Sequence, residues 1–426
     1  MSKVLIITYY WPPAGGPGVQ RLLKFAKYLP EFGWDPIILT VKKGNFPAYD
    51  GSLLDEVPSQ IKVYKTTNYE PDVIYRQLSG SKKEKIPVAV LAQRDLSWKK
   101  KIAHWIRLNL FIPDAKIGWI KPALKTAEKI CFQEKIDLIM SSSPPPTTHL
   151  IARKLKQKTG IKWIADFRDP WTKIHYYRSV KRHKFAIRKD EVLEKSVLTE
   201  CNAITTASRK FQELLPIPPD KIRMTITNGF DEEVSDVHAV SDDKFTMVHT
   251  GGLSSNRYYE DFFRGLKDFL SEEKYLMKTR LLLVGNVDHE IVNKIREYVP
   301  ERVLEITGYL PHQKAVEKMQ NAAVNLIFLE QLTDYKGHIP GKIFEYIKVK
   351  RQILGAGDPE GDAAEIIRKS GCGEVYPAGS NWRSIIQNYF GMWKNNVSLR
   401  IDQNYIDQFH RRKLTEKLSN LMNEIL

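Results

Sequence analysis

The sequence predicts an α/β protein built from two successive Rossmann-like domains, and three observations support this fold class. Short apolar runs alternate with amphipathic helical patterns along the whole chain, as in parallel sheets covered by helices. The order of strand, glycine loop and helix occurs near residue 4 and again near residue 245. The length of 426 residues suits two or three domains at about 150 residues each.

The first domain is predicted over residues 1–231. A strand at 4–9 is followed by a loop rich in glycine and proline, and then by a helix at about 19–32 with apolar residues at helical spacing. A second strand is predicted at 36–41. Four further short, buried strands are predicted at 136–140, 163–165, 203–206 and 223–226.

The second domain is predicted over residues 245–400. Before it, residues 232–244 are largely acidic, polar and without periodicity, which indicates a linker. The pattern then restarts with a strand at 245–249, a glycine loop and a helix at 259–270. Residues 401–426 are predicted as a C-terminal helix, for which a return to the first domain is one option.

The positive charge is concentrated in one half of the chain. Residues 1–240 contain 40 Lys and Arg against 25 Asp and Glu, a net charge of +15, whereas the remainder contains 26 against 25. A basic half attracts a polyanionic surface such as an anionic membrane or nucleic acid, and surplus solubilising lysine is the alternative. No nucleic-acid-binding module is recognisable, so nucleic acid is not an expected partner.

Simple counts exclude other classes of protein. No apolar run approaches the roughly 18 residues that a membrane-spanning helix needs, and the start of the chain is unlike a signal peptide. Cys131, Cys201 and Cys372 form no CxxC pair, so neither a disulfide framework nor a structural zinc site is expected. We therefore expect a cytoplasmic protein.

Residues 98–110 have the composition of a helix that lies on a membrane surface. One helical face is shared by four apolar side chains, namely Trp98, Ile102, Trp105 and Ile106. The other face is largely cationic and carries Lys100, Lys101, His104 and Arg107. A buried helix with a cationic outer side is the alternative. A second basic run at 178–189 favours an anionic membrane through charge alone.

The loop after the first strand contains glycines suited to an anion site. Gly15 and Gly16 precede the first helix, where backbone N–H groups can approach a phosphate closely. The loop does not follow the GxGxxG pattern, and no acidic residue closes the second strand at the usual spacing. A nicotinamide cofactor is therefore not expected, and a plain turn is the alternative reading of this loop.

The equivalent loop of the second domain contains Gly251 and Gly252. Arg257 stands just before the next helix, where a guanidinium can add a bidentate phosphate contact to the field of the helix terminus. A solvated arginine is the alternative.

A later helix of the same domain begins near Pro340 and Gly341. Lys342 is predicted in its first turn, where the helix dipole disfavours a cation unless an anion is bound. Glu345, one turn further on, is suited to accept hydrogen bonds from the hydroxyls of a sugar. The alternative is an exposed lysine followed by a capping glutamate.

Charged residues also follow a strand of the first domain, in the run from Asp166 through Arg168 and Asp169 to Trp171. The carboxyl ends of parallel strands are where open α/β sheets bind ligands. An internal salt bridge between an aspartate and an arginine is the alternative.

Together these segments resemble the nucleotide-sugar glycosyltransferase family numbered four, of the bacterial surface-polysaccharide type, over nearly the whole chain. The resemblance implies the GT-B fold, with two Rossmann-like domains facing each other across a cleft. Its order and spacing are more specific than any one motif. The motifs are Gly15-Gly16, Ser143-Pro144-Pro145, Asp166 to Trp171, Thr227 to Asp231, Thr250-Gly251-Gly252-Leu253, Gly308 to His312, and Pro340 to Tyr346.

The resemblance also implies roles for particular residues. In such enzymes the second domain holds the nucleotide-sugar, and Glu345 matches the glutamate that binds the ribose. Arg257 matches a diphosphate-binding lysine, and Gly15 with Gly16 matches the loop that approaches the donor phosphates from the first domain. The resemblance further implies that the anomeric configuration of the sugar is retained.

Three positions depart from the family pattern. Gly252 stands where the family usually has an arginine, and Gly337 stands where it usually has a second glutamate. Many members have a histidine at the strand end near Asp169, and the closest residue to that position here is Arg168. Lys342 supplies a positive charge that partly replaces the missing arginine. The departures leave the donor sugar open.

The sequence thus predicts a glycosyltransferase that moves a sugar from a nucleoside diphosphate sugar to a glycan or lipid-linked acceptor. Asp169 and Arg168 are the predicted catalytic residues. There is no Asp-x-Asp motif, so we expect neither a metal nor another cofactor. The expected location is the cytoplasm, at the inner face of the cell membrane. The alternative is a catalytically degenerate protein that binds an anionic polymer, a membrane or a partner.

Overall fold

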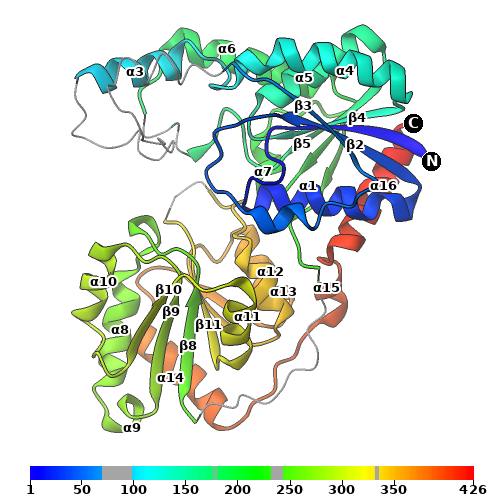
Figure 1. The fold of residues 1–426 in the computed structure, drawn as a ribbon. Helices are drawn as coiled ribbons and strands as arrows, with labels where there is room; N and C mark the ends of the chain where they lie inside the picture. The colour runs from blue at the N-terminus through cyan, green and yellow to red at the C-terminus, as the bar shows by residue number, and fades with distance from the viewer. Residues whose placement is uncertain (70–97, 176, 178–179, 232–242, 332–334) are drawn as a thin grey trace. The chain divides into compact units, whose positions relative to one another are not determined.

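The computed structural model describes residues 1–69, 98–175, 177, 180–231, 243–331 and 335–426, and for residues 99, 100 and 103 it describes the backbone alone (Figure 1). Most of the predicted linker, at 232–242, lies outside the described residues. The chain forms two compact units. The first contains Met1–Asn228 and Arg411–Leu426, and the second contains Gly229–His410.

Within its described residues, the first unit contains a parallel sheet of seven strands in the order β3-β2-β1-β4-β5-β6-β7. The strand order changes direction between β1 and β4, because β1 pairs with β2 on one side and with β4 on the other. The strands are β1 Ser2–Thr8, β2 Trp34–Val41, β3 Lys62–Thr66, β4 Leu138–Ser143, β5 Lys162–Phe167, β6 Ala203–Thr206 and β7 Ile222–Thr225.

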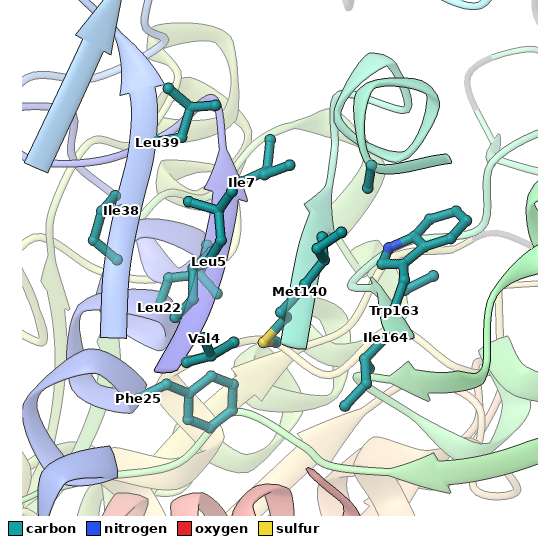
Figure 2. Packing of buried hydrophobic residues seen from close by; sticks show 14 of the residues in the cluster. Val4, Leu5, Ile7, Leu22, Phe25, Ile38, Leu39, Met140, Trp163 and Ile164 are labelled. Carbon is teal, nitrogen blue, oxygen red and sulfur yellow. The ribbon is translucent and has the colours of Figure 1, made fainter. Parts of the chain in front are cut away.

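Helices pack against this sheet through apolar faces. Leu22 and Phe25 of α1 lie against Val4 of β1, in a core that continues to Met140 and Trp163 (Figure 2). The helices among the described residues of this unit are α1 Pro17–Tyr28, α3 Trp98–Asn109, α4 Ile120–Glu134, α5 Thr147–Thr159, α6 Lys184–Glu200, α7 Arg209–Leu214 and α16 Arg411–Ile425, with short 3-10 turns η1 Leu29–Phe32, η2 Gly51–Leu54 and η4 Ile117–Trp119.

The second unit contains a parallel sheet of six strands in the order β10-β9-β8-β11-β12-β13, counted over its described residues. Its strand order changes direction between β8 and β11. The strands are β8 Phe245–Thr250, β9 Thr279–Val284, β10 Leu304–Gly308, β11 Val324–Phe328, β12 Gln352–Ala356 and β13 Gly373–Tyr376. The described helices of this unit are α8 Glu260–Leu270, α9 Glu273–Leu276, α10 His289–Arg296, α11 His312–Asn321, α12 Lys342–Lys348, α13 Asp362–Lys369, α14 Trp382–Lys394 and α15 Gln403–Asp407, with the 3-10 turn η6 Ser255–Arg257.

Two parallel sheets with flanking helices confirm the predicted α/β class. The predicted helix at 19–32 is too long, because α1 ends at Tyr28 and the chain continues as the 3-10 turn η1. Pro30 lies inside this turn, and a proline cannot donate the backbone hydrogen bond that an α-helix needs there.

The C-terminal segment is two helices rather than one. Between α15 and α16, the backbone N–H of Phe230 donates to the carbonyl oxygen of Phe409, and the Phe409 side chain is buried. This pairing interrupts the helix. Leu418 and Met422 of α16 are buried in the core of the first unit, and α16 lies beside α1 (Figure 1).

None of the described helices combines the length and the hydropathy that crossing a membrane requires.

Candidate functional site

The candidate donor site lies at the carboxyl ends of β8 and β11, where the strand order of the second sheet changes direction. This is where open α/β sheets leave a crevice for ligands. The segments that follow the two strands are joined directly. The N–H of Gln331 donates to the carbonyl oxygen of Asn256 at 2.9 Å, and its side-chain amide donates to the carbonyl oxygen of Tyr258 at 2.8 Å.

Tyr346 fixes α12 beneath the ends of these strands. Its buried hydroxyl accepts a hydrogen bond from the N–H of Thr250 at 3.0 Å and donates to the carbonyl oxygen of Leu326 at 3.1 Å. One side chain thereby links α12 to both β8 and β11. The positions of the residues at the start of α12 follow from this link.

Lys342, the first residue of α12, points its ammonium group at the loop after β8. Its Nζ lies 3.3 Å from Nε2 of His249 in β8. Gly251 has a φ of +91°, and a Cβ atom there would lie 3.4 Å from the Lys342 Nζ. A glycine is therefore required at 251 for backbone conformation, and it also leaves room for the lysine.

No carboxylate forms an ion pair with Lys342 among the described residues. Burial, and to a lesser degree the positive charge of Arg257, lower the pKa of this lysine from its usual 10.5 to about 7. A cation held next to another cation, without an acidic partner, is stabilised by binding an anion. The charge distribution therefore suits a phosphate group.

Arg257 has an acidic partner that the sequence did not reveal. Its Nη2 donates to Oε1 of Glu330, the second residue after β11, at 2.7 Å, and both side chains are largely buried. The Nε of Arg257 has no hydrogen-bond partner among the described residues. Glu330 offsets part of the positive charge of Arg257, whereas Lys342 has no acidic partner in the part of the chain that the structure describes.

Glu345 lies one turn after Lys342 on α12 and has a side chain that is 20% exposed. Its Oε2 is buried without a hydrogen-bond partner among the described residues. Two side-chain nitrogens are near but too far to donate hydrogen bonds, since Lys348 Nζ lies 3.8 Å from Oε2 and His312 Nε2 lies 3.9 Å from Oε1. A buried carboxylate oxygen in this state suits hydroxyl donors from a ligand.

The two remaining glycines of this site, Gly341 and Gly252, differ in their surroundings. Gly341 is the N-cap residue of α12, and its carbonyl oxygen accepts from the N–H of Phe344. A Cβ atom on Gly252 would meet only the carbonyl oxygen of Asn286, at 3.6 Å. The position therefore has room for a side chain.

In the first unit, Gly15 and Gly16 differ in what they can offer a ligand. The N–H of Gly15 is already bonded to the carbonyl oxygen of Ala48 at 3.0 Å, and a Cβ there would lie 3.2 Å from that of Asp50. Gly16 is the N-cap residue of α1, has a φ of +104°, and has open space around its Cα. Gly15 thus packs against the segment after β2, and Gly16 leaves the start of α1 open.

Arg168 is held at the end of β5 by backbone oxygens. Its Nε donates to the carbonyl of Ser143 at 2.8 Å and its Nη2 to that of Pro144 at 2.7 Å. Its Nη1 lies over Gly18 at the start of α1. Asp169 follows it and is half-buried.

Asp166 lies inside β5, one residue beyond the predicted strand, and is fully buried. The guanidinium of Arg21 binds it at 2.9 Å, and the hydroxyls of Ser142 and Thr205 each donate to it at 2.7 Å. Burial alone would raise the pKa of Asp166, but Arg21 and the hydroxyls hold it below its usual value. Asp166 therefore forms an internal salt bridge, which was the alternative to ligand binding in the sequence analysis, and its partner is Arg21.

Comparison with known proteins gives a match in structure and none in sequence. No protein-family model matches the chain, and no curated protein matches it. HepE from Anabaena, solved in complex with UDP, is 12% identical, with all of both chains covered and a TM-score of 0.65. Sucrose-phosphate synthase from Thermosynechococcus elongatus is also 12% identical, with 100% of this chain and 99% of that one covered and a TM-score of 0.63. The fold is GT-B.

A glycosyltransferase from Rickettsia africae has the same fold, at 14% identity and a TM-score of 0.62, covering 100% of this chain and 98% of that one. At these identities the likeness concerns the fold alone. Membership in the family numbered four and retention of anomeric configuration stay predictions.

Within this GT-B chain, the structure brings together the predicted residues of the second unit. Gly251, Arg257 and Lys342 lie around one point, with Glu345 one turn away. The residues predicted in the first unit, Gly15, Gly16, Arg168 and Asp169, follow β1 and β5 of the other sheet.

Three residues of this candidate site were not predicted from the sequence, namely His249, Glu330 and Tyr346. His249 had a usable signal, because a histidine follows the apolar Met247 and Val248 of a predicted buried strand just before the glycine loop. Glu330 and Tyr346 had no local signal, since each acts on a residue 73 or more positions away.

Proposed function

We propose that the protein is a glycosyltransferase that takes a sugar from a nucleoside diphosphate sugar. The observation that carries this is Lys342, a partly buried lysine that has a neutral imidazole and a glycine loop beside it and no acidic partner among the described residues. The solved neighbour HepE binds UDP, and related crystals of it contain UDP-glucose, which supports the same class of donor here.

The chemistry requires positive charge at the leaving group. As the glycosidic bond breaks, the bond's electron pair stays with the diphosphate, whose negative charge grows, and preorganised cations stabilise that charge. Lys342 and Arg257 are the side chains proposed for this role. The backbone N–H groups of the loop at Gly251 and Gly252 add donors to the same region.

Glu345 is proposed to bind the ribose. Its Oε2 has no hydrogen-bond donor among the residues that the structure describes, and a ribose diol supplies two hydroxyl donors. One turn of helix separates this carboxylate from Lys342, so a nucleotide can place its ribose and diphosphate against the same short helix.

Arg168 and Asp169 are proposed as the catalytic residues of the first unit, facing the reacting centre or the acceptor hydroxyl. Their position supports this proposal, because both residues follow β5 at the carboxyl edge of its sheet. Two backbone carbonyls hold the Arg168 side chain in place. No metal is proposed, so transfer is expected to persist in the presence of a chelator.

The acceptor is proposed to be a glycan or lipid-linked glycan of cell-surface polysaccharide synthesis, reached from the inner face of the cell membrane. The support is the orientation of α3. Its apolar residues Trp98, Ile102 and Trp105 are exposed, while His104, predicted on the largely cationic face, is buried. A helix with aromatic residues outward and a histidine inward has the exposure expected of an interfacial helix.

The neighbouring helix extends this surface. The N–H of His183 donates to Oδ1 of Asn109 at 2.5 Å, which ties the start of α6 to the end of α3, and α3 lies beside α6 in Figure 1. Phe185 at the start of α6 is exposed, and Lys184 and Lys189 flank it. Exposed aromatic and cationic groups together favour an anionic lipid surface.

The rival proposal is a catalytically degenerate GT-B protein that only binds. Release or transfer of sugar from a panel of nucleotide-sugars, measured with and without a chelator, separates the two. Turnover that is lost in Lys342→Ala supports the enzyme. Binding of nucleotide-sugars without any turnover, with all acceptors tested, would favour the rival.

A further inference from the structure

His249 is a histidine inside a strand, and its side chain has no exposed surface. It lies in β8, two residues before Gly251. Its ring packs beside Phe328 of β11, with the ring centroids 5.2 Å apart. The ring thus lies directly under the loop that carries the proposed diphosphate site.

The two ring nitrogens of His249 have different partners. Nδ1 lies 3.1 Å from the carbonyl oxygen of Leu326, and because a carbonyl only accepts, Nδ1 carries the proton. In the neutral ring Nε2 then has a lone pair, and it lies 3.3 Å from Nζ of Lys342. The ring accepts a hydrogen bond from the ammonium group on one side and is anchored to β11 on the other.

The surroundings keep the ring neutral. Burial lowers the pKa of His249 well below its usual value, and the charges of Lys342 and Arg257 lower it further, against the opposing effect of the Leu326 and Gly252 carbonyls. On the elements packed nearby, Glu330 pairs with Arg257, Glu345 and Lys348 of α12 lie 3.8 Å from each other, and Tyr346 donates to Leu326. Burial raises the pKa of Tyr346 to about 12, so it too is uncharged near neutral pH.

We propose that His249 is a positioning residue, which holds the Lys342 ammonium group toward the diphosphate of the nucleotide-sugar. The identity of that anion rests on the proposed function, whereas the contact between His249 and Lys342 does not. An ammonium group has three donors, and His249 occupies one of them, which leaves two for phosphate oxygens.

A neutral acceptor suits this place better than a charged one. A carboxylate at 249 would neutralise Lys342 and repel the diphosphate, so the lysine would be fixed but the site would lose its charge. An imidazole with its proton committed to Leu326 orients the lysine without adding negative charge.

The first test measures Lys342 directly, in the full-length protein without ligand. Limiting acetic anhydride acetylates the unprotonated amine, so the rate at Lys342 against pH, read by mass spectrometry, gives its titration midpoint. His249→Phe keeps a buried ring but removes the acceptor, and His249→Gln keeps an acceptor of similar reach. We expect the midpoint to fall by about one to two pH units in His249→Phe, the loss of a hydrogen bond to a charged group, and to stay near that of the natural protein in His249→Gln.

A merely structural role for His249 gives a different result. It would lower thermal stability in both variants and leave the Lys342 midpoint unchanged. Equal midpoints in the natural protein and in folded His249→Phe would overturn the proposal. Should His249→Phe not fold, His249→Leu applies the same test.

The second test measures affinity for inorganic pyrophosphate and for UDP by calorimetry at pH 7. We expect His249→Phe to bind both about 10-fold or more weakly, and His249→Gln to bind within about threefold of the natural protein. If the natural protein binds neither anion, the proposed donor site is wrong, and the acetylation midpoints still decide the role of His249. Equal affinity in all three proteins would overturn the positioning role.

Discussion

The guanidinium of Arg168 lies over the Cα of Gly18, so closely that a methyl group on Gly18 would overlap Nη1. Gly18 is the second residue of α1, which follows β1, and Arg168 follows β5, so two segments distant in sequence fit together in the first unit. Because Gly18 has no side chain, the guanidinium of Arg168 can occupy the space beside its Cα. The hydrogen bonds from Arg168 to Ser143 and Pro144 depend on that space.

Gly18→Ala should therefore displace Arg168. We expect a loss of about 1 to 3 kcal/mol in the free energy of unfolding, since hydrogen bonds from a charged group are broken. We also expect activity to fall to the level of Arg168→Ala. Gly51→Ala is the matched control, because a Cβ atom at Gly51 meets nothing within 4 Å. Chemical unfolding and turnover measure the two effects. An unchanged Gly18→Ala protein would show that Arg168 is not held in this way.

Lys342 should make nucleoside diphosphate binding depend on pH. In the ligand-free protein its pKa is about 7, and a bound diphosphate raises it, so binding takes up a proton above pH 7. We expect the affinity for UDP to fall by up to tenfold per pH unit between about pH 7 and 9. Calorimetry in two buffers of different ionisation enthalpy measures the proton uptake directly.

Lys342→Arg is the control for this dependence. An arginine stays charged, so the proton uptake at this site should vanish while cationic character remains. Lys342→Met should weaken UDP binding by about 1.5 to 3 kcal/mol at pH 7. Identical pH profiles in all three proteins would show that Lys342 does not contact the anion.

Lys342 should also change the pH dependence of stability. Its pKa in the folded protein is below the usual 10.5, so the unfolded chain binds the additional proton between about pH 7 and 10.5. Burying Lys342 therefore costs no folding free energy above pH 10.5. The cost grows as the pH falls from 10.5 to 7, and it is complete below pH 7. Lys342→Met removes this cost, so the variant should be more stable than the natural protein. We expect the difference in the free energy of unfolding between the two proteins to be larger at pH 6 than at pH 9. A constant difference would contradict this.

Glu345 should distinguish nucleotides from simple diphosphates. Glu345→Ala removes the proposed ribose contact and leaves the cations in place, so affinity for UDP should fall by about 1 to 3 kcal/mol. Affinity for inorganic pyrophosphate, which has no ribose, should not fall. If calorimetry shows that both ligands weaken equally, Glu345 acts on the structure of α12 and not on the sugar.

The exposed aromatic residues of α3 should carry the salt-resistant part of membrane binding. Trp98 and Trp105 are 67% and 50% exposed. Replacing both with Ala should reduce sedimentation with anionic vesicles at high salt, where charge attraction is screened. Phe132→Ala is the control, because Phe132 on α4 is 87% exposed and outside this surface. Equal losses in the two variants, or no binding by the natural protein, would contradict the proposed surface.

The local motifs of the site could be predicted from the sequence, but their partners could not. Gly251 and Lys342 stand out because a strand, a glycine loop and a helix start are local patterns. The contact of Lys342 with His249 spans 93 residues and depends on β8 lying beside β11, an order that no local pattern contains. The pairing of Arg257 with Glu330 spans 73 residues for the same reason.

Periodicity also leaves open which face of a helix is buried. The spacing of residues 98–110 grouped the aromatic side chains correctly, yet it could not tell whether that group faces the core. His104, expected on the largely cationic face, is buried, whereas Lys101 of that face is exposed. Asp166 was placed at a strand end, whereas pairing with β6 continues β5 through Phe167 and buries it.

The central claim is that a nucleoside diphosphate binds against Lys342, and protection of that amine tests it most directly. The ligand-free protein and the protein saturated with each of several nucleoside diphosphates are acetylated briefly at pH 7.5, and every lysine is quantified by mass spectrometry. We expect at least one nucleotide to slow acetylation of Lys342 about tenfold or more, because the bound anion keeps the amine protonated, while lysines of α4 and α6 react as before. Acetylation of Lys342 at an unchanged rate in the presence of every nucleotide, including any that calorimetry shows to bind, would contradict the claim.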